Sequence, residues 1–109
     1  MDVKLKAEDS KKRMREYDIS GEITLQTIEE LSLKLKDCVI SCDDLTINLK
    51  QITGFDVAAF QFFYSLKNSF IRDKKKLLVN CSLSEEVTQL LKNCGIEDLK
   101  SVLSIKRED

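Results

Sequence analysis

One strand-to-helix unit decides the fold of this chain, and it reads LTINLKQITGFDVAAFQFFYSLKNSFIR over residues 45–72. Leu45, Ile47 and Leu49 alternate with polar residues, which is typical of a strand with one buried face. The second half of the unit repeats its apolar residues every three or four positions and is too long for a strand. Asp56 is the expected N-cap of this helix, because its carboxylate can accept hydrogen bonds from the first free backbone N–H groups.

The helical half of this unit has one apolar side and one polar side on a helical wheel. Its apolar stripe, flanked by Phe60 and Ile71, consists of Ala59, Phe63, Leu66 and Phe70. Its polar face consists of Gln61, Ser65, Asn68 and Arg72. We expect the apolar stripe to pack against the sheet and the polar face to contact water.

A hairpin precedes this unit. Alternating apolar and polar residues predict strands over residues 3–7 and 13–20, joined by a charged turn. Gly21 breaks the alternation, so we expect the second strand to end there.

A first helix is expected between the hairpin and the central unit. Apolar residues recur every three or four positions from Ile28 to Cys38, which predicts a helix that ends near Ser41. Thr27 and Glu30 have the spacing of a capping box, in which side chain and backbone of the two residues bond reciprocally.

Further elements are expected after the central unit. Residues 77–79 form a short continuous apolar run, typical of a buried parallel strand. Ser84 is expected to cap a third helix that ends at Gly95, and residues 99–105 are expected to form a last strand before a charged tail at residues 106–109. A hairpin followed by strand–helix–strand crossovers predicts an α/β fold with parallel strands side by side.

Length and charge limit the possible functions. The chain has 109 residues, enough for one domain, and we expect residues 1–109 to form a single unit. Its 18 Lys and Arg against 19 Asp and Glu lack the basic excess that binds nucleic acid. No apolar run approaches the roughly 20 residues of a membrane span, and residues 1–10 lack the apolar stretch of a signal peptide. We therefore expect a cytoplasmic protein without nucleic-acid binding or membrane insertion.

The residue types argue against an enzyme, a cofactor or a metal site. The chain has no histidine, the commonest general base and metal ligand. Cys38 and Cys42 are spaced more widely than the pair in most zinc knuckles, and Cys81 and Cys94 form no second close pair. We favour four thiols that act as small apolar residues over a zinc site.

The junction from Thr53 to Ala59 is the one unusual segment, with a glycine and two alanines around a helix start. Free N–H groups at a helix start can bind an anion, a phosphate or a partner's side chain. Neither a P-loop nor a GxGxxG fingerprint is present, so a nucleotide site has no support from a motif. A plain capped helix is the simpler interpretation of the spacing.

Three stretches, taken in order, resemble the STAS domain, the fold of bacterial anti-sigma factor antagonists and of the cytoplasmic tails of sulfate transporters. The stretches are Ile19–Ile23, similar to the family's "GELD"-like turn, Leu45–Asp56, and Val79–Val87 with Cys94–Ile96 beyond. The resemblance covers about residues 17–103. It implies a STAS-like, four- to five-stranded mixed sheet with a layer of helices on one face.

The resemblance also implies a docking surface for a protein partner around the start of the second helix. Its residues here are Gly54, Phe55, Asp56, Val57, Ala58, Gln61 and Phe62. Two of them have an alternative role in the core, because Phe55 can act as a hydrophobic staple and Phe62 lies at the flank of the apolar stripe.

Switching members of the family carry Asp-Ser-Ser-Gly or Asp-Ser-Thr-Gly at this helix start, and a kinase phosphorylates the third residue. The corresponding residues here are Asp56, Val57, Ala58 and Ala59. Alanine has no hydroxyl, so the resemblance implies no phosphorylation at Ala58, and the charge-based switch cannot operate there.

Two hypotheses follow from the resemblance. In the first, the chain is a non-enzymatic antagonist or scaffold in signal transduction that regulates transcription in a bacterium by docking on an anti-sigma factor or a sensor-kinase-like protein. In the second, it is the cytoplasmic STAS subunit of a phospholipid-type ABC transporter and docks on the ATPase. A weak homodimer is compatible with either hypothesis. An enzyme that hydrolyses ATP or GTP is the third and least supported hypothesis, because the motifs are missing.

Overall fold

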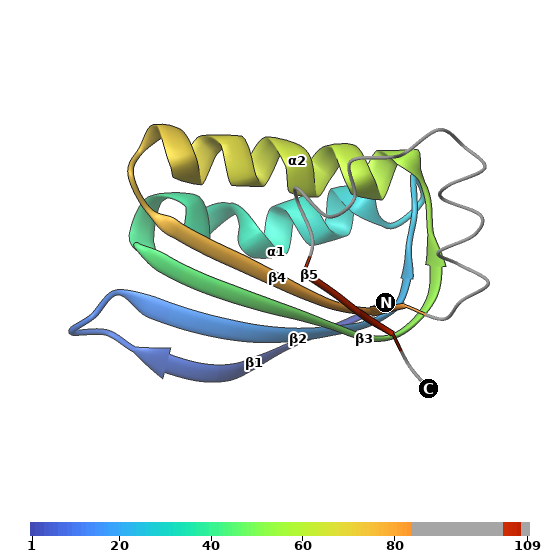
Figure 1. The fold of residues 1–109 in the computed structure, drawn as a ribbon, viewed down its shortest axis with the longest axis horizontal. Helices are drawn as coiled ribbons and strands as arrows, with labels where there is room; N and C mark the ends of the chain where they lie inside the picture. The colour runs from blue at the N-terminus through green and yellow to red at the C-terminus, as the bar shows by residue number, and fades with distance from the viewer. Residues whose placement is uncertain (84–103, 108–109) are drawn as a thin grey trace.

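The computed structural model of the chain describes residues 1–83 and 104–107, and within them the chain forms five strands and two helices (Figure 1). In chain order they are β1 (Asp2–Asp9), β2 (Met14–Ile23), α1 (Ile28–Ser41), β3 (Asp44–Phe55), α2 (Val57–Arg72), β4 (Lys76–Leu83) and β5 (Ser104–Arg107). None of the helices formed by these residues has the length and apolarity to span a bilayer.

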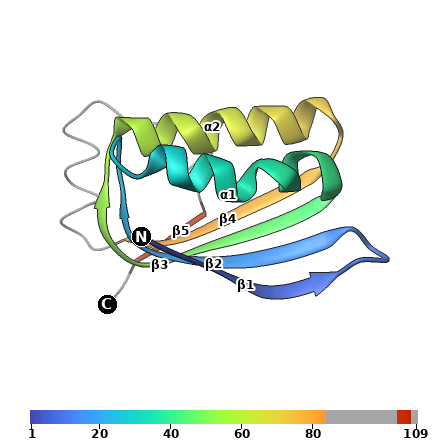
Figure 2. The same cartoon turned by 180° about the vertical axis from the view of Figure 1, so that it is seen from behind.

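The strands form one mixed sheet in the order β1-β2-β3-β4-β5. β1 and β2 pair antiparallel as a hairpin. The pairs β2–β3, β3–β4 and β4–β5 are parallel. Figures 1 and 2 show α1 and α2 side by side over the same face of the sheet. The predicted mixed sheet with helices on one face is therefore confirmed, as are the hairpin and the parallel crossovers.

The core lies between this sheet face and the two helices. α1 contributes Leu31, Leu35 and Cys38, and the predicted stripe of α2 is buried as Ala59, Phe63, Leu66 and Phe70. Ile71, expected beside that stripe, is 62% exposed. One residue corresponds to about 100° around a helix, so the position after Phe70 is turned away from the sheet.

The run at residues 77–79 is a parallel strand as predicted, but it is not buried on both faces. Val79 is buried, whereas Leu78 is 46% exposed. Successive side chains of a strand point to opposite faces, and α1 and α2 both cover the other face from Leu78. The continuous apolar run suggested two covered faces, which was wrong for this position.

The face without α1 and α2 carries a polar network centred on Asn48, whose side chain is buried. Its amide nitrogen donates to Glu16 Oε2 at 2.6 Å and to Asp18 Oδ1 at 3.0 Å, and its oxygen accepts from Asn80 at 3.0 Å. The hydrogen bond from Asn48, helped by the Lys50 ammonium, lowers the pKa of Asp18. Every polar atom of the Asn48 amide is thus engaged within the sheet.

β2 and β3 bend upward toward the helices at one end of the sheet (Figure 1). The bend coincides with register shifts between the two strands around Ile19 and Gly21, where Gly21 has φ +95° and Gln51 has φ +51°. We expected β2 to end at Ser20, but it continues through the irregularity to Ile23. Gly21 therefore bends the strand without ending it, because glycine adopts positive φ without steric cost.

Gly21→Ala is expected to lower the free energy of unfolding by about 1–2 kcal/mol. A Cβ at this position would meet Met1 Cα at 3.1 Å while the backbone stays at a φ that favours glycine. Urea denaturation measures the change, with Ser20→Ala on the same strand as the control, expected within about 0.5 kcal/mol of the unchanged chain. Equal effects of the two substitutions would show that the bend does not need glycine.

The two ends of α1 differ in how well they were predicted. The helix ends at Ser41 as expected, but the capping box at its start is wrong, because Thr27 makes no side-chain cap bond. Its hydroxyl instead accepts from Thr24 N at 3.0 Å and donates to the carbonyl of Glu22 at 2.9 Å. Glu30 pairs with Lys34 at 3.2 Å.

The third helix with its caps at Ser84 and Gly95 lies outside the described residues. The last strand is described only from Ser104 to Arg107, so the predicted strand at residues 99–105 is described in part. Its continuation through Lys106 and Arg107 corrects the expectation of a charged tail at these two positions.

Candidate functional site

The site is built where two helices begin side by side. The pairing of β2 with β3 places Glu22 opposite Gly54 and Ile23 opposite Phe55 at the bent end of the sheet. α1 follows β2 after a short loop, and α2 follows β3 directly. Both helices consequently start at the same end of the molecule (Figure 1).

Asp56 connects the two helix starts. It is the N-cap of α2 as predicted, since its Oδ1 accepts from Ala59 N at 3.1 Å. Its Oδ2 accepts from Leu25 N at 2.9 Å, and Leu25 lies in the loop before α1. The Asp56 carboxylate therefore caps α2 and also holds the loop before α1 against the start of α2.

The loop before α1 is tied down by its own hydrogen bonds. Thr24 O accepts from the backbone N–H groups of Thr27 and Ile28, at 3.0 and 2.9 Å. The Thr24 hydroxyl can donate its one proton to the side-chain oxygen of either Glu22 or Gln26, each 3.0 Å away. The position of Leu25 is therefore set by the backbone on both sides as well as by Asp56.

Aromatic rings pack against one another near the start of α2. Phe55 is buried and stacks on Phe63, with ring centroids 6.2 Å apart and an interplanar angle of 4°. Phe62 is half-buried and meets Phe63 edge to face at 5.2 Å. Phe55 thus belongs to the core, in contact with Phe63, and its ring is not available to a partner.

The exposed part of the site is small and mostly apolar. Leu25 is 73% exposed and Val57 is 43% exposed. Ala58 is half-buried and Gln61 is exposed on the same side of α2, one turn from Val57. We call Leu25, Val57, Ala58 and Gln61 the two-helix tip. Of the predicted docking residues, Val57, Ala58 and Gln61 lie on it and Asp56 supports it.

Gly54 and Leu25 illustrate what the sequence could and could not reveal at this site. A Cβ on Gly54 would lie 2.9 Å from Glu22 Cγ, so glycine at this position leaves room for the Glu22 side chain of β2. Leu25 was not predicted as a site residue. An exposed leucine next to a helix start is the only local signal, and its link to Asp56 spans 31 residues.

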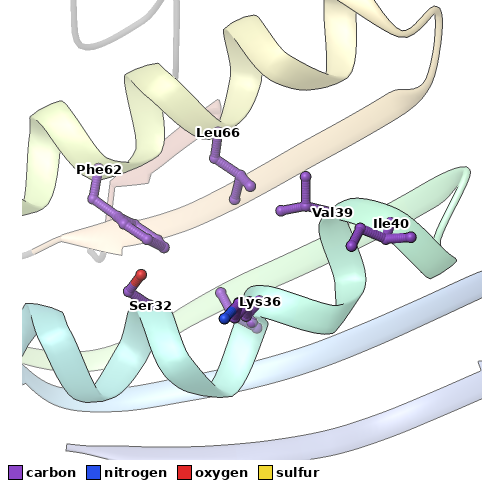
Figure 3. A pocket seen from close by; sticks show the side chains of 7 residues that line it. Ser32, Lys36, Val39, Ile40, Phe62 and Leu66 are labelled. Carbon is purple, nitrogen blue, oxygen red and sulfur yellow. The ribbon is translucent and has the colours of Figure 1, made fainter.

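Phe62 is not part of the tip but lies next to it, in a groove between α1 and α2 (Figure 3). The groove has a volume of about 290 Å³, and its apolar walls are Leu35, Val39, Ile40, Phe62 and Leu66. Ser32 and Lys36 also line it. In Figure 3, Phe62 and Leu66 point from α2 toward α1, which makes Phe62 a groove residue.

The thiols and the titratable groups with a displaced pKa lie elsewhere. Cys38 and Cys42 are buried and free, as small apolar residues would be. Burial is the main cause that raises the pKa of Tyr17 to about 12, and the contact with Cys38 raises it further. Burial also raises the pKa of the Cys42 thiol. Within residues 1–83 and 104–107, no cluster of three or more Cys, Asp or Glu side chains is placed to hold a metal ion.

Taken together, the tip offers a small contact surface. The Asp56 carboxylate is engaged by two backbone N–H groups, and the tip consists of aliphatic side chains and one amide. An exposed apolar patch can bind another protein.

Comparison with known proteins identifies the family of this chain. The sequence profile of the STAS domain matches residues 8–106. The chain therefore belongs to the STAS domain family. Among curated proteins, none has a sequence that matches this chain significantly.

Solved structures agree with the fold. The anti-sigma factor antagonist SpoIIAA in its unphosphorylated form is similar with a TM-score of 0.67 and 9% identity, over 99% of this chain and 89% of that one. The Bacillus cell fate determinant SpoIIAA in its phosphorylated form has a TM-score of 0.65 and 9% identity, over 98% of this chain and 93% of that one. At this identity the likeness concerns the fold.

Proposed function

We propose that this chain is a non-enzymatic regulatory module that docks on a protein partner through the two-helix tip, in the manner of an anti-sigma factor antagonist. The observation that carries the proposal is the exposed apolar tip, whose two loops are joined by Asp56. The STAS family assignment and the similarity of the fold to SpoIIAA support the antagonist type. The partner is an anti-sigma factor or a sensor-kinase-like protein in a bacterial cytoplasm.

Ala58 makes this docking independent of phosphorylation at the family position. A phosphoryl group would add about two negative charges at neutral pH beside the apolar tip. The methyl group of Ala58 cannot accept it, so the tip keeps one charge state. Regulation of the partner then depends on the amount of this chain or on a group elsewhere in it.

Ala58→Glu is expected to weaken partner binding at least tenfold, because it places a charge in an apolar contact without a partner for it. The chain with an affinity tag is used to recover the partner from native lysate, and mass spectrometry identifies the partner and any phosphate on this chain. The affinity of the purified partner for both variants is then measured by calorimetry. An unchanged affinity of the Ala58→Glu variant would show that the tip is not part of the interface.

The control is Ser65→Glu, which introduces the same charge on the exposed polar face of α2 and should leave the affinity unchanged. Thermal unfolding of both variants shows that the fold is retained. Recovery of an ATP-binding-cassette protein would favour the transporter-subunit hypothesis. Turnover of ATP or GTP that depends on Asp56 would show that the chain is an enzyme and contradict the proposal.

A further inference from the structure

The groove between α1 and α2 is an apolar surface that the tip does not use. Five apolar side chains line it, and one of them, Ile40, is 76% exposed. Figure 3 shows Val39 and Ile40 on α1 and Phe62 and Leu66 on α2 around the same space. Phe62 follows Gln61 of the tip directly, so groove and tip are adjacent on α2.

The walls of the groove determine which backbone can lie in it. Both walls are helices, whose main-chain N–H and C=O groups are already bonded within each helix, apart from the helix ends. An extended segment would bury its own backbone groups there without partners, which is costly. A helix satisfies its backbone internally and needs only apolar side chains at every third or fourth position.

The mouth of the groove carries one positive charge. Lys36 lines the groove and, among the described residues, has no carboxylate within ion-pair distance. Lys34 on the same helix is instead paired with Glu30 at 3.2 Å and does not line the groove. A ligand that carries a carboxylate next to its apolar side chains would complement this arrangement.

The same charge argues against a second copy of the chain as the occupant. A two-fold axis through the groove would bring the two Lys36 ammonium groups toward each other, because Lys36 lines the groove and is exposed. Like charges across an interface are unfavourable. Within the groove itself, no Asp or Glu side chain is available to offset them.

We propose that the groove between α1 and α2 binds an amphipathic helix of the protein partner, with apolar side chains between Ile40 and Phe62 and an acidic side chain paired with Lys36. The groove spans Ser32 to Ile40 along α1, about 12 Å, which corresponds to roughly two turns of a docked helix. This inference rests on the proposed function and gives the partner a second contact beside the tip.

Two synthetic helical peptides test the charge and the place of binding. Both carry leucines at i, i+3 and i+7; one has glutamates at the flanking positions and the other has lysines. NMR titration of the ¹⁵N-labelled chain should show shifts of the amides of Lys36, Ile40 and Leu66, with about fivefold tighter binding of the glutamate peptide. Lys36→Glu should reverse the preference, whereas Lys34→Glu, which changes the net charge equally, should retain it. Absence of shifts in the groove, or no dependence on peptide charge, would overturn the proposal.

The recovered partner provides the second test. Ile40→Ser should weaken binding of the partner about tenfold, because an exposed apolar contact is lost. Leu33→Ser changes a similarly exposed leucine of α1 outside the groove and should alter the affinity less than twofold. If Ala58→Glu weakens binding while Ile40→Ser does not, the tip is the contact for the partner and the groove proposal fails. If Ile40→Ser weakens binding while Ala58→Glu does not, the groove is the contact and the tip proposal fails. A dimer in sedimentation equilibrium that Ile40→Ser dissociates would assign the groove to a second copy and overturn the inference.

Discussion

Asp56→Ala is expected to lower the free energy of unfolding by about 2 kcal/mol and the midpoint of thermal unfolding by about 10 °C. Two hydrogen bonds are lost, from Ala59 N to Oδ1 and from Leu25 N to Oδ2. Loss of an N-cap costs about 1 kcal/mol, and the second bond contributes about as much. The loop before α1 is also released, so Leu25 no longer has a fixed position beside α2.

Asp56→Asn separates the two bonds. The amide oxygen can still accept from Ala59 N, whereas the amide NH₂ cannot accept from Leu25 N. We expect about half of the destabilisation of Asp56→Ala together with weaker partner binding, because the cap of α2 is kept while the tip is loosened. Asp37→Ala, an exposed carboxylate of α1, serves as the control and should stay within about 0.5 kcal/mol. An effect of Asp56→Ala no larger than that of Asp37→Ala would contradict the bridging role.

The elements themselves could be predicted because their signals are local. The period of apolar residues located both helices, including the end of α1 at Ser41, and the cap of α2 at Asp56 depends on residues three positions apart. The bond from Leu25 to Asp56 has no such signal. It exists only because β2 and β3 are parallel neighbours whose ends bend together, and neither the register nor the bend could be inferred from periodicity.

The errors have the same origin. The Thr27 hydroxyl was expected to cap its own helix, but it instead donates a hydrogen bond to the carbonyl of Glu22 at the end of β2. Leu78 was expected to be buried, but the helices α1 and α2 both lie on the other face of the sheet. Burial of Phe55 could be stated only as an alternative, because the position of its ring depends on Phe63 in the following helix. In each case a contact between elements decided between local possibilities.

Phe63→Ala is expected to have the largest effect on stability, with a loss of about 4 kcal/mol in the free energy of unfolding. Phe63 is fully buried, stacks on Phe55 and receives the edge of Phe62. Its removal leaves a cavity in the core beside Phe55 and takes away two aromatic contacts, each contributing about 1 kcal/mol beyond burial. A domain of this size has a free energy of unfolding of about 5–15 kcal/mol, so the variant should be marginally stable. Equilibrium urea denaturation measures the loss. If the alanine variant does not fold, Phe63→Leu can be measured instead, with an expected loss of about 1–2 kcal/mol in the free energy of unfolding.

Phe62→Ala is the matched comparison, because it removes the neighbouring ring of the same helix. From the sequence alone, Phe62 was expected to affect binding with little effect on unfolding. Its half-buried position against Phe63 now predicts a moderate destabilisation of about 1–2 kcal/mol as well as weaker partner binding through the groove. Phe63→Leu should affect binding only as far as it affects folding. If both substitutions reduced stability equally and neither changed the affinity of the folded protein, Phe62 would be a core residue alone, and the groove would lose its wall on α2 as a contact for the partner.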